Sequence, residues 1–168
     1  MKRVEHGLVS ADPANTGFLY RLNREHVLAP AVLSAVAARR EILRRLTAAV
    51  VHLLPVPVHA SLFGSLARGE AGSHSDLDLL LVTDDDLDTH DPLWTNQVLA
   101  LADRVVAWTG NRMETLTFTR SRLSDVIAQD EPIVASWLSD SILLHGPSIE
   151  TLVASAGGTS TPTKAVRR

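Results

Sequence analysis

The sequence HASLFGSLARGEAGSHSDLDLLLV, residues 59–82, contains the features from which the fold can be predicted. It opens within an apolar segment, residues 56–63, whose β-branched and large side chains predict a strand. Gly64-Ser65 interrupts this segment, and a short run able to form a helix follows at residues 66–68. We therefore predict a strand, a tight turn and the start of a helix, with Ser65 as its N-cap residue.

The predicted turn has the properties of a phosphate-binding site. A glycine at position 64 lets the backbone approach a ligand closely. Unpaired N–H groups at the start of a helix lie at the positive end of the helix dipole, where a phosphate is favoured. The Gly64-Ser65 turn is thus a candidate site for a polyphosphate, and the alternative is an ordinary turn.

Two aspartates stand at the start of the second predicted strand. Asp76 and Asp78 precede the uninterrupted apolar run at residues 79–82, which is typical of a strand buried on both faces. Side chains at positions i and i+2 of a strand share a face, with α-carbons about 6.5 to 7 Å apart. Two carboxylates so placed repel each other unless a cation lies between them. They can bind one hard cation or bridge two, and the alternative is a solvated strand end.

The combined pattern resembles a known superfamily. The chain has GS, ten further residues and then DxD, with Arg68-Gly69-Glu70 after the GS and Ser75 before the first aspartate. This pattern is similar to that of the DNA polymerase beta-like nucleotidyltransferases, and most of all to the minimal nucleotidyltransferases. The resemblance implies an α/β (α+β) fold in which a small mixed sheet is flanked by helices.

The resemblance also implies a site and a reaction. Gly64 and Ser65 would bind the β and γ phosphates of a nucleoside triphosphate, with Arg68 as a helper. Asp76 and Asp78 would bind two Mg²⁺ ions. An acceptor hydroxyl would attack the α-phosphate, most plausibly of ATP, and pyrophosphate would leave.

A third carboxylate is found in a later predicted strand. Residues 112–119 alternate in polarity, which places Glu114, Leu116 and Phe118 on one face. The superfamily supplies a third carboxylate from a strand beside the DxD strand, so the resemblance implies that Glu114 completes the metal site and acts as the general base. The commoner residue there is aspartate, which leaves a catalytically weakened domain as the alternative.

Composition is that of an ordinary globular protein. The chain has 168 residues, of which 45% are hydrophobic and 21% charged, and its formal net charge is −3, so composition favours no general nucleic-acid-binding surface. The sequence has no cysteine, which excludes disulfides and thiolate chemistry. We find no apolar run long enough to span a membrane and no signal peptide, and we expect a cytoplasmic protein.

We predict three regions. Residues 1–27 form a hairpin, with strands at 7–9 and 18–23, that resembles the wing of a winged-helix domain. No recognition helix precedes it, so we expect no direct DNA binding by this chain alone. Residues 28–150 form the nucleotidyltransferase domain, and residues 151–168 form a disordered tail. Helices are predicted at 30–53, 92–108 (ended by Gly110), 121–128 (capped by Ser121) and 132–139, and a last strand at 142–144.

The acceptor of the transferred group is open at this stage. The resemblance implies an antitoxin that transfers AMP to a partner toxin, a HEPN-type ribonuclease. A small-molecule acceptor of the aminoglycoside type is the second interpretation, and a binding module without turnover is the third. His74, between the GS turn and the DxD, is interpreted as a bystander because no histidine pair has a zinc-like spacing.

Overall fold

The structure is a computed structural model that describes residues 2–3, 7–70, 75–129 and 131–156. It divides into two compact units, Met1–Arg44 and Arg45–Arg168. The division falls inside helix α1 (Ala29–Val50). Among the described helices, none combines the length and the apolar character that crossing a membrane requires.

The first unit contains a three-stranded antiparallel sheet. Its strands are β1 (Lys2–Arg3), β2 (Val9–Ala14) and β3 (Gly17–Leu22), in the order β1-β2-β3. The predicted hairpin is confirmed, but its turn is shorter than expected. Ala14 pairs with Gly17, so β2 extends through residues assigned to the turn and only two residues connect the strands. The likeness to a wing remains a prediction.

Helix α1 begins in the first unit and ends in the second. Pro30 lies in its first turn, as expected of a residue whose missing N–H would have no helical partner there. The helix ends at Val50, three residues before the predicted end. Leu46, Ala49 and Val50, in the part that belongs to the second unit, are buried.

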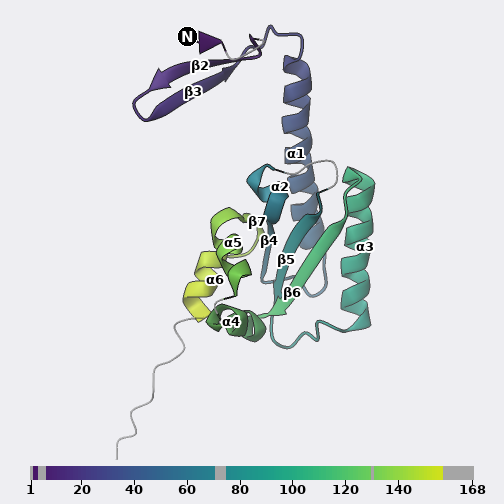
Figure 1. Ribbon diagram of the computed structural model, residues 1–168. Helices are drawn as coiled ribbons and strands as arrows, with labels where there is room; N and C mark the ends of the chain where they lie inside the picture. Colours follow the sequence, from purple (N-terminus) through teal and green to yellow (C-terminus); the bar gives the residue numbers. More distant parts are fainter. Residues whose placement is uncertain (1, 4–6, 71–74, 130, 157–168) are drawn as a thin grey trace, which may run out of the picture. The chain divides into compact units, whose positions relative to one another are not determined.

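The second unit is built on a four-stranded mixed sheet in the order β6-β5-β4-β7 (Figure 1). The strands are β4 (His59–Phe63), β5 (Leu77–Thr83), β6 (Met113–Thr119) and β7 (Ile142–His145). Strand β4 runs antiparallel to β5 and to β7, whereas β5 and β6 are parallel. The mixed α/β architecture predicted from the sequence is therefore confirmed.

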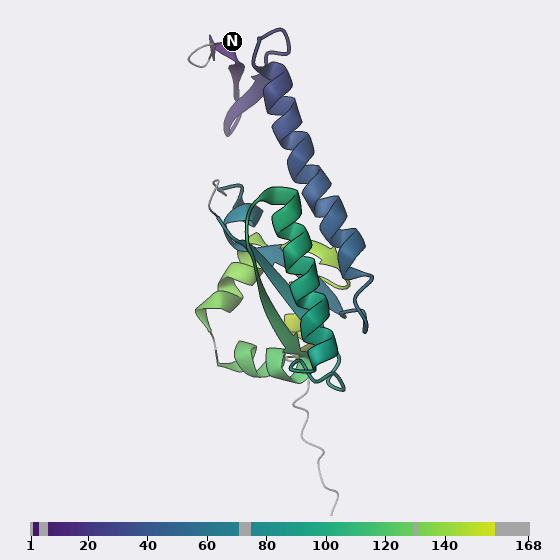
Figure 2. The same ribbon diagram turned by 90° about the vertical axis from the view of Figure 1, so that its right-hand side faces the viewer.

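Strand β5 lies at the centre of the core. Four successive residues of the predicted apolar run, Leu79 to Val82, have no solvent-exposed surface. Helix α3 (Pro92–Thr109) lies along one face of the sheet, and α4 (Arg120–Ala128), α5 (Pro132–Asp140) and α6 (Ile149–Ala156) gather on the other (Figures 1 and 2). Leu80 and Val82 pack with α4, α5 and α6. Because side chains alternate along a strand, Leu79 and Leu81 point to the opposite face of the sheet.

One expectation about helix ends is confirmed, and one needs correction. Gly110 ends α3 in the left-handed conformation, with φ of 77°, as predicted. Helix α4 is capped by Thr119 and not by Ser121: the Thr119 hydroxyl accepts a hydrogen bond from the Arg122 N–H. Ser121 lies inside the helix, and its N–H and hydroxyl both donate to Asp85 at 2.8 Å.

The first part of the predicted tail is helical. Residues 151–156 belong to α6, because Ile149 and Leu152 are buried in the core shared with α4 and α5. An apolar pair three residues apart anchors one face of a helix. The remainder of the predicted tail lies outside the described residues.

Candidate active site

The Gly64-Ser65 turn lies directly beside the second aspartate of the DxD. Strand β4 ends at Phe63, which pairs with Asp78 of β5, so the turn starts next to the Asp78 side chain. Gly64 has φ of +73°, a conformation that other residues rarely adopt. A Cβ built on Gly64 would overlap Oδ2 of Asp78 and lie 3.0 Å from its Cγ. Both the backbone conformation and the available space therefore require glycine here.

The helix after the turn begins two residues earlier than predicted. Helix α2 spans Gly64–Arg68, and its N-cap residue is Phe63, which makes no side-chain capping hydrogen bond. Ser65 is not the N-cap residue, since it already lies within the helix.

The predicted carboxylates meet at one end of the sheet. Asp78 of β5 is the register partner of Glu114 of β6, which confirms that Glu114 comes from the strand beside the DxD strand. Neighbouring strands lie about 4.8 Å apart, and partner side chains share a face. Asp76 is exposed and lies just before β5. The three carboxylates thus lie at the same end of the sheet as the Gly64-Ser65 turn.

The electrostatics of Asp78 reflect this crowding. Burial raises the pKa of its carboxyl group above the ordinary value, and the negative charges of Asp76 and Glu114 raise it further. The Arg68 guanidinium acts in the opposite direction. The ionised form of Asp78 is therefore disfavoured unless positive charge lies nearby.

The donor set fits a hard divalent cation in its chemistry. Carboxylate oxygens are the ligands that Mg²⁺ prefers, and a cation would relieve the repulsion that raises the pKa of Asp78. Within the described part of the chain, however, no three histidine, aspartate or glutamate side chains are arranged together to hold a metal ion. The residues that could bind the cation are Asp76, Asp78 and Glu114, with some adjustment of their side chains.

Asn111 fixes the approach to β5 and was not identified from the sequence. Its Nδ2 donates to the Ser75 carbonyl at 2.6 Å, and the Leu77 N–H donates to the Arg112 carbonyl at 2.8 Å. These contacts position the backbone on both sides of Asp76. An asparagine just after a helix-ending glycine reads as part of a turn, so the sequence offered no signal for this contact.

Arg68 lies at the end of α2 and interacts with two carboxylates. Its Nε donates to Glu70 Oε2 at 2.8 Å, and Nη1 donates to Asp140 Oδ2 at 3.4 Å. Both contacts raise the pKa of the Arg68 guanidinium, so it stays fully charged. Asp140 is 72 positions away in the sequence, and no motif indicated its presence here.

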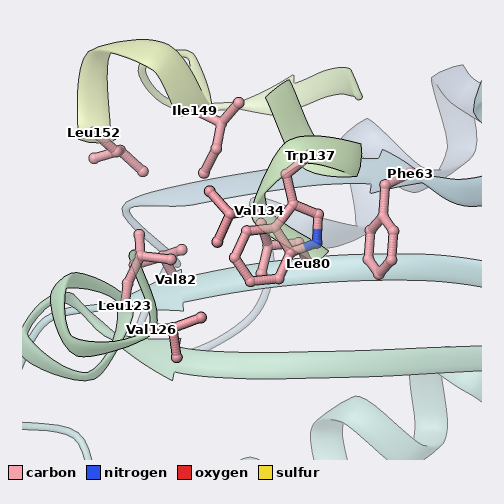
Figure 3. Close-up of a cluster of buried hydrophobic side chains, with 9 residues drawn as sticks. All are labelled: Phe63, Leu80, Val82, Leu123, Val126, Val134, Trp137, Ile149 and Leu152. Atoms are coloured by element: carbon pink, nitrogen blue, oxygen red, sulfur yellow. The ribbon is translucent and has the colours of Figure 1, made fainter. Parts of the chain in front are cut away.

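A cluster of three aromatic side chains, Phe63, Phe118 and Trp137, packs beside the start of the turn. Trp137 of α5 is fully buried, with its ring edge-on to Phe63 at 6.2 Å and tilted against Phe118 at 5.7 Å. Its indole nitrogen lies on the side toward Phe63, above Leu80 (Figure 3), and has no hydrogen-bond partner among the described residues. Phe63 directly precedes Gly64, so this packing fixes the start of the turn. His74 lies outside the described residues.

Comparison with known proteins gives one family match and several distant structural likenesses. The family model described as "Nucleotidyltransferase domain" matches residues 43–130, just over half of the chain. No curated protein matches.

Three solved structures are similar in part. One is a toxin–antitoxin complex with AMP-PNP (14% identity, 68% of this chain and 82% of that one, TM-score 0.47). Another is a mutant of the toxin–antitoxin pair MntA–HpeT (15%, 68% and 82%, 0.49). The third is a tri-AMPylated Shewanella oneidensis HEPN toxin in complex with an MNT antitoxin (14%, 70% and 82%, 0.46). We base no conclusion on likenesses this distant.

Proposed function

Because the chain belongs to the nucleotidyltransferase domain family, we propose that it transfers AMP from ATP to a hydroxyl group of a partner protein. The observation that carries this proposal is the meeting of the Gly64-Ser65 turn with the paired carboxylates. Asp78 contacts the turn through Gly64 and is the register partner of Glu114. A triphosphate bound at the turn would thus lie beside the groups that handle the reacting hydroxyl.

Each part of the site has a role in this reaction. The start of α2 and the Arg68 guanidinium would bind the β and γ phosphates. The acceptor oxygen would attack the α-phosphorus in line, its bond to phosphorus forming as the bond to the β-phosphate oxygen breaks. Glu114 would accept the hydroxyl proton, and pyrophosphate would leave.

Mg²⁺ bound by Asp76, Asp78 and Glu114 would neutralise triphosphate charge and lower the pKa of the acceptor hydroxyl. The environment of Asp78 supports this assignment: burial first, and then the charges of Asp76 and Glu114, raise the pKa of its carboxyl group, and a nearby cation would offset both effects. Positioning by the rigid β5–β6 pair would supply the remainder of the rate.

The segment after β6 favours a protein acceptor over a small molecule. Among the described residues, that segment forms the helices α4, α5 and α6, whose buried side chains join one core with β4 and β5. These three helices cover one face of the sheet, and they form no separate lobe that could enclose a small substrate. The resemblance of the GS–DxD pattern to minimal nucleotidyltransferases suggests a HEPN-type toxin as the partner.

Transfer of label from α-labelled ATP to proteins of a lysate from the source cells, in the presence of Mg²⁺, tests the proposal. We expect a labelled protein band with the wild-type chain and none with Asp76→Ala/Asp78→Ala. The matched control is Asp86→Ala/Asp88→Ala, which removes two exposed acids with the same spacing from the loop after β5. It should label as the wild type does.

Two other results would change the assignment. Label in the small-molecule fraction, with none in protein, would favour a small-molecule acceptor. Persistent nucleotide binding without label in either fraction would contradict the catalytic function and leave a binding module.

A further inference from the structure

The guanidinium of Arg68 is held between two carboxylates from different parts of the chain. Glu70 lies two residues after Arg68, whereas Asp140 is the last residue of α5. The contact with Asp140 is long, at 3.4 Å, and joins two partly exposed side chains. Such a contact contributes little to folding stability. The contact between Arg68 and Asp140 is therefore better explained by an effect on the orientation of Arg68 than by an effect on folding stability.

Helix α5 holds both ends of α2. Trp137 and Asp140 are three residues apart in α5 and so lie on the same face of that helix. Trp137 packs against Phe63, which directly precedes α2, and Asp140 binds Arg68, which ends it. Because Trp137 is fully buried, α5 is a fixed support, and Asp140 presents its carboxylate from that support.

The position of Asp140 is unfavourable for α5 itself. The negative end of the helix dipole opposes an acidic side chain at the C-terminus of a helix, and the last turn of α5 has no basic residue. Arg68 supplies the missing positive charge from α2. The interaction with Arg68 thus offsets an otherwise unfavourable position of this acid.

The two contacts with described residues do not use all the donors of Arg68. A guanidinium has five N–H donors in a rigid planar arrangement, and the contacts with Glu70 and Asp140 use Nε and Nη1. Fixing two nitrogen atoms of a planar group fixes the direction of the remaining donors. Arg68 also acts electrostatically on Asp78, so its charge is felt at the candidate active site.

We propose that Asp140 is a positioning residue for the nucleotide: by holding Nη1 it orients the remaining Arg68 donors for the triphosphate at the Gly64-Ser65 turn. This inference rests on the proposed function. Asp140 itself does not touch the nucleotide. Its effect therefore passes through Arg68 and disappears when Arg68 is removed.

Calorimetric titration with ATP and Mg²⁺ tests this inference without knowledge of the acceptor. We expect Asp140→Ala to weaken ATP binding by roughly three- to tenfold, as lost orientation of a charged hydrogen-bond donor would. Asp140→Asn keeps an oxygen that can accept from Nη1 and should retain most of the affinity. Arg68→Ala/Asp140→Ala should bind ATP no more weakly than Arg68→Ala alone. A thermal unfolding curve for each variant establishes that it is folded.

Glu131→Ala is the matched control, because it removes an exposed acid from the opposite end of α5 and changes the net charge equally. It should bind ATP as the wild type does. Unchanged affinity in Asp140→Ala would overturn the inference. Tighter binding by both Asp140 variants would also overturn it, since Asp140 would then compete with phosphate. A wild-type chain that does not bind ATP would refute the proposed function itself.

Discussion

Replacement of Gly64 by alanine tests the contact on which the candidate site depends. The substitution adds one methyl group at a backbone φ of +73°, directly against the Asp78 carboxylate. Gly69 provides a matched control within the same short segment. Its φ is +76°, and a Cβ built there meets no atom of the described residues within 4 Å. The two glycines thus share the backbone penalty and differ in the contact with Asp78.

The expected magnitudes follow from these two geometries. A non-glycine residue in the left-handed region costs about 1 to 2 kcal/mol, of which about 0.4 to 1 kcal/mol is recovered because alanine restricts the unfolded chain. Gly69→Ala should therefore destabilise the fold by about 1 kcal/mol. Gly64→Ala must in addition displace the Asp78 carboxylate, and overpacking of this kind costs about 1 to 3 kcal/mol. Its total cost should be about 2 to 4 kcal/mol.

A double-mutant cycle separates the two contributions. Without Oδ2 and Cγ, the remaining Cβ of residue 78 would lie 3.5 Å from the new methyl group, which is an ordinary contact. Gly64→Ala in an Asp78→Ala background should thus cost no more than Gly69→Ala. The measurement is the free energy of unfolding from urea titrations. Equal costs of Gly64→Ala with and without Asp78 would refute the inferred contact between the turn and the carboxylate.

Three further predictions concern charge and position. Without metal at neutral pH, Asp78→Asn should unfold at a higher temperature than the wild type. Because the pKa of Asp78 is raised in the folded state, the stability of the wild type falls as the pH rises from the ordinary carboxyl pKa through the pKa of folded Asp78. The advantage should vanish in acid, and Mg²⁺ should raise the unfolding temperature of the wild type only. Burial lowers the pKa of His59 despite its hydrogen bond to the Pro147 carbonyl. The free energy of unfolding should therefore decline as the pH falls below about 6.5, the ordinary histidine pKa, and it should decline less steeply in His59→Asn. Asn111→Ala should lower the free energy of unfolding by about 1 kcal/mol. It should also reduce the rate of label transfer more than the affinity for ATP. An unchanged rate of transfer would contradict the positioning of Asp76 by Asn111.

Local signals in the sequence were sufficient for the central elements. The apolar run after Asp78 predicted a buried strand, because a strand covered on both faces accepts four large apolar residues in succession. Alternation placed Glu114 on one face with Leu116 and Phe118, and β6 retains that arrangement. Pro92 and Gly110 marked the two ends of α3, since each residue has a conformational preference suited to one end of a helix.

Features that depend on long-range packing were not predictable in the same way. The register that pairs Asp78 with Glu114 is determined by how α3 returns the chain to the sheet, and no periodicity reports this. Ser65 looked like an N-cap residue by residue type, but α2 begins at Gly64 and its N-cap residue is Phe63. The contact between Asp140 and Arg68 joins two helices that have no local relation in the sequence.

The order of strands in the sheet also bears on how the chain folds during synthesis. Strand β7 is the last strand of the described residues to be synthesised, yet it pairs with β4, the first strand of its unit. Until residue 145 has left the ribosome, one edge of β4 lacks its partner, and β4 is a wholly buried strand in the native fold. Unpaired apolar edges invite association with other chains, and pairing over a long sequence separation is slow. Truncated chains that lack β7 are therefore the species most prone to aggregate.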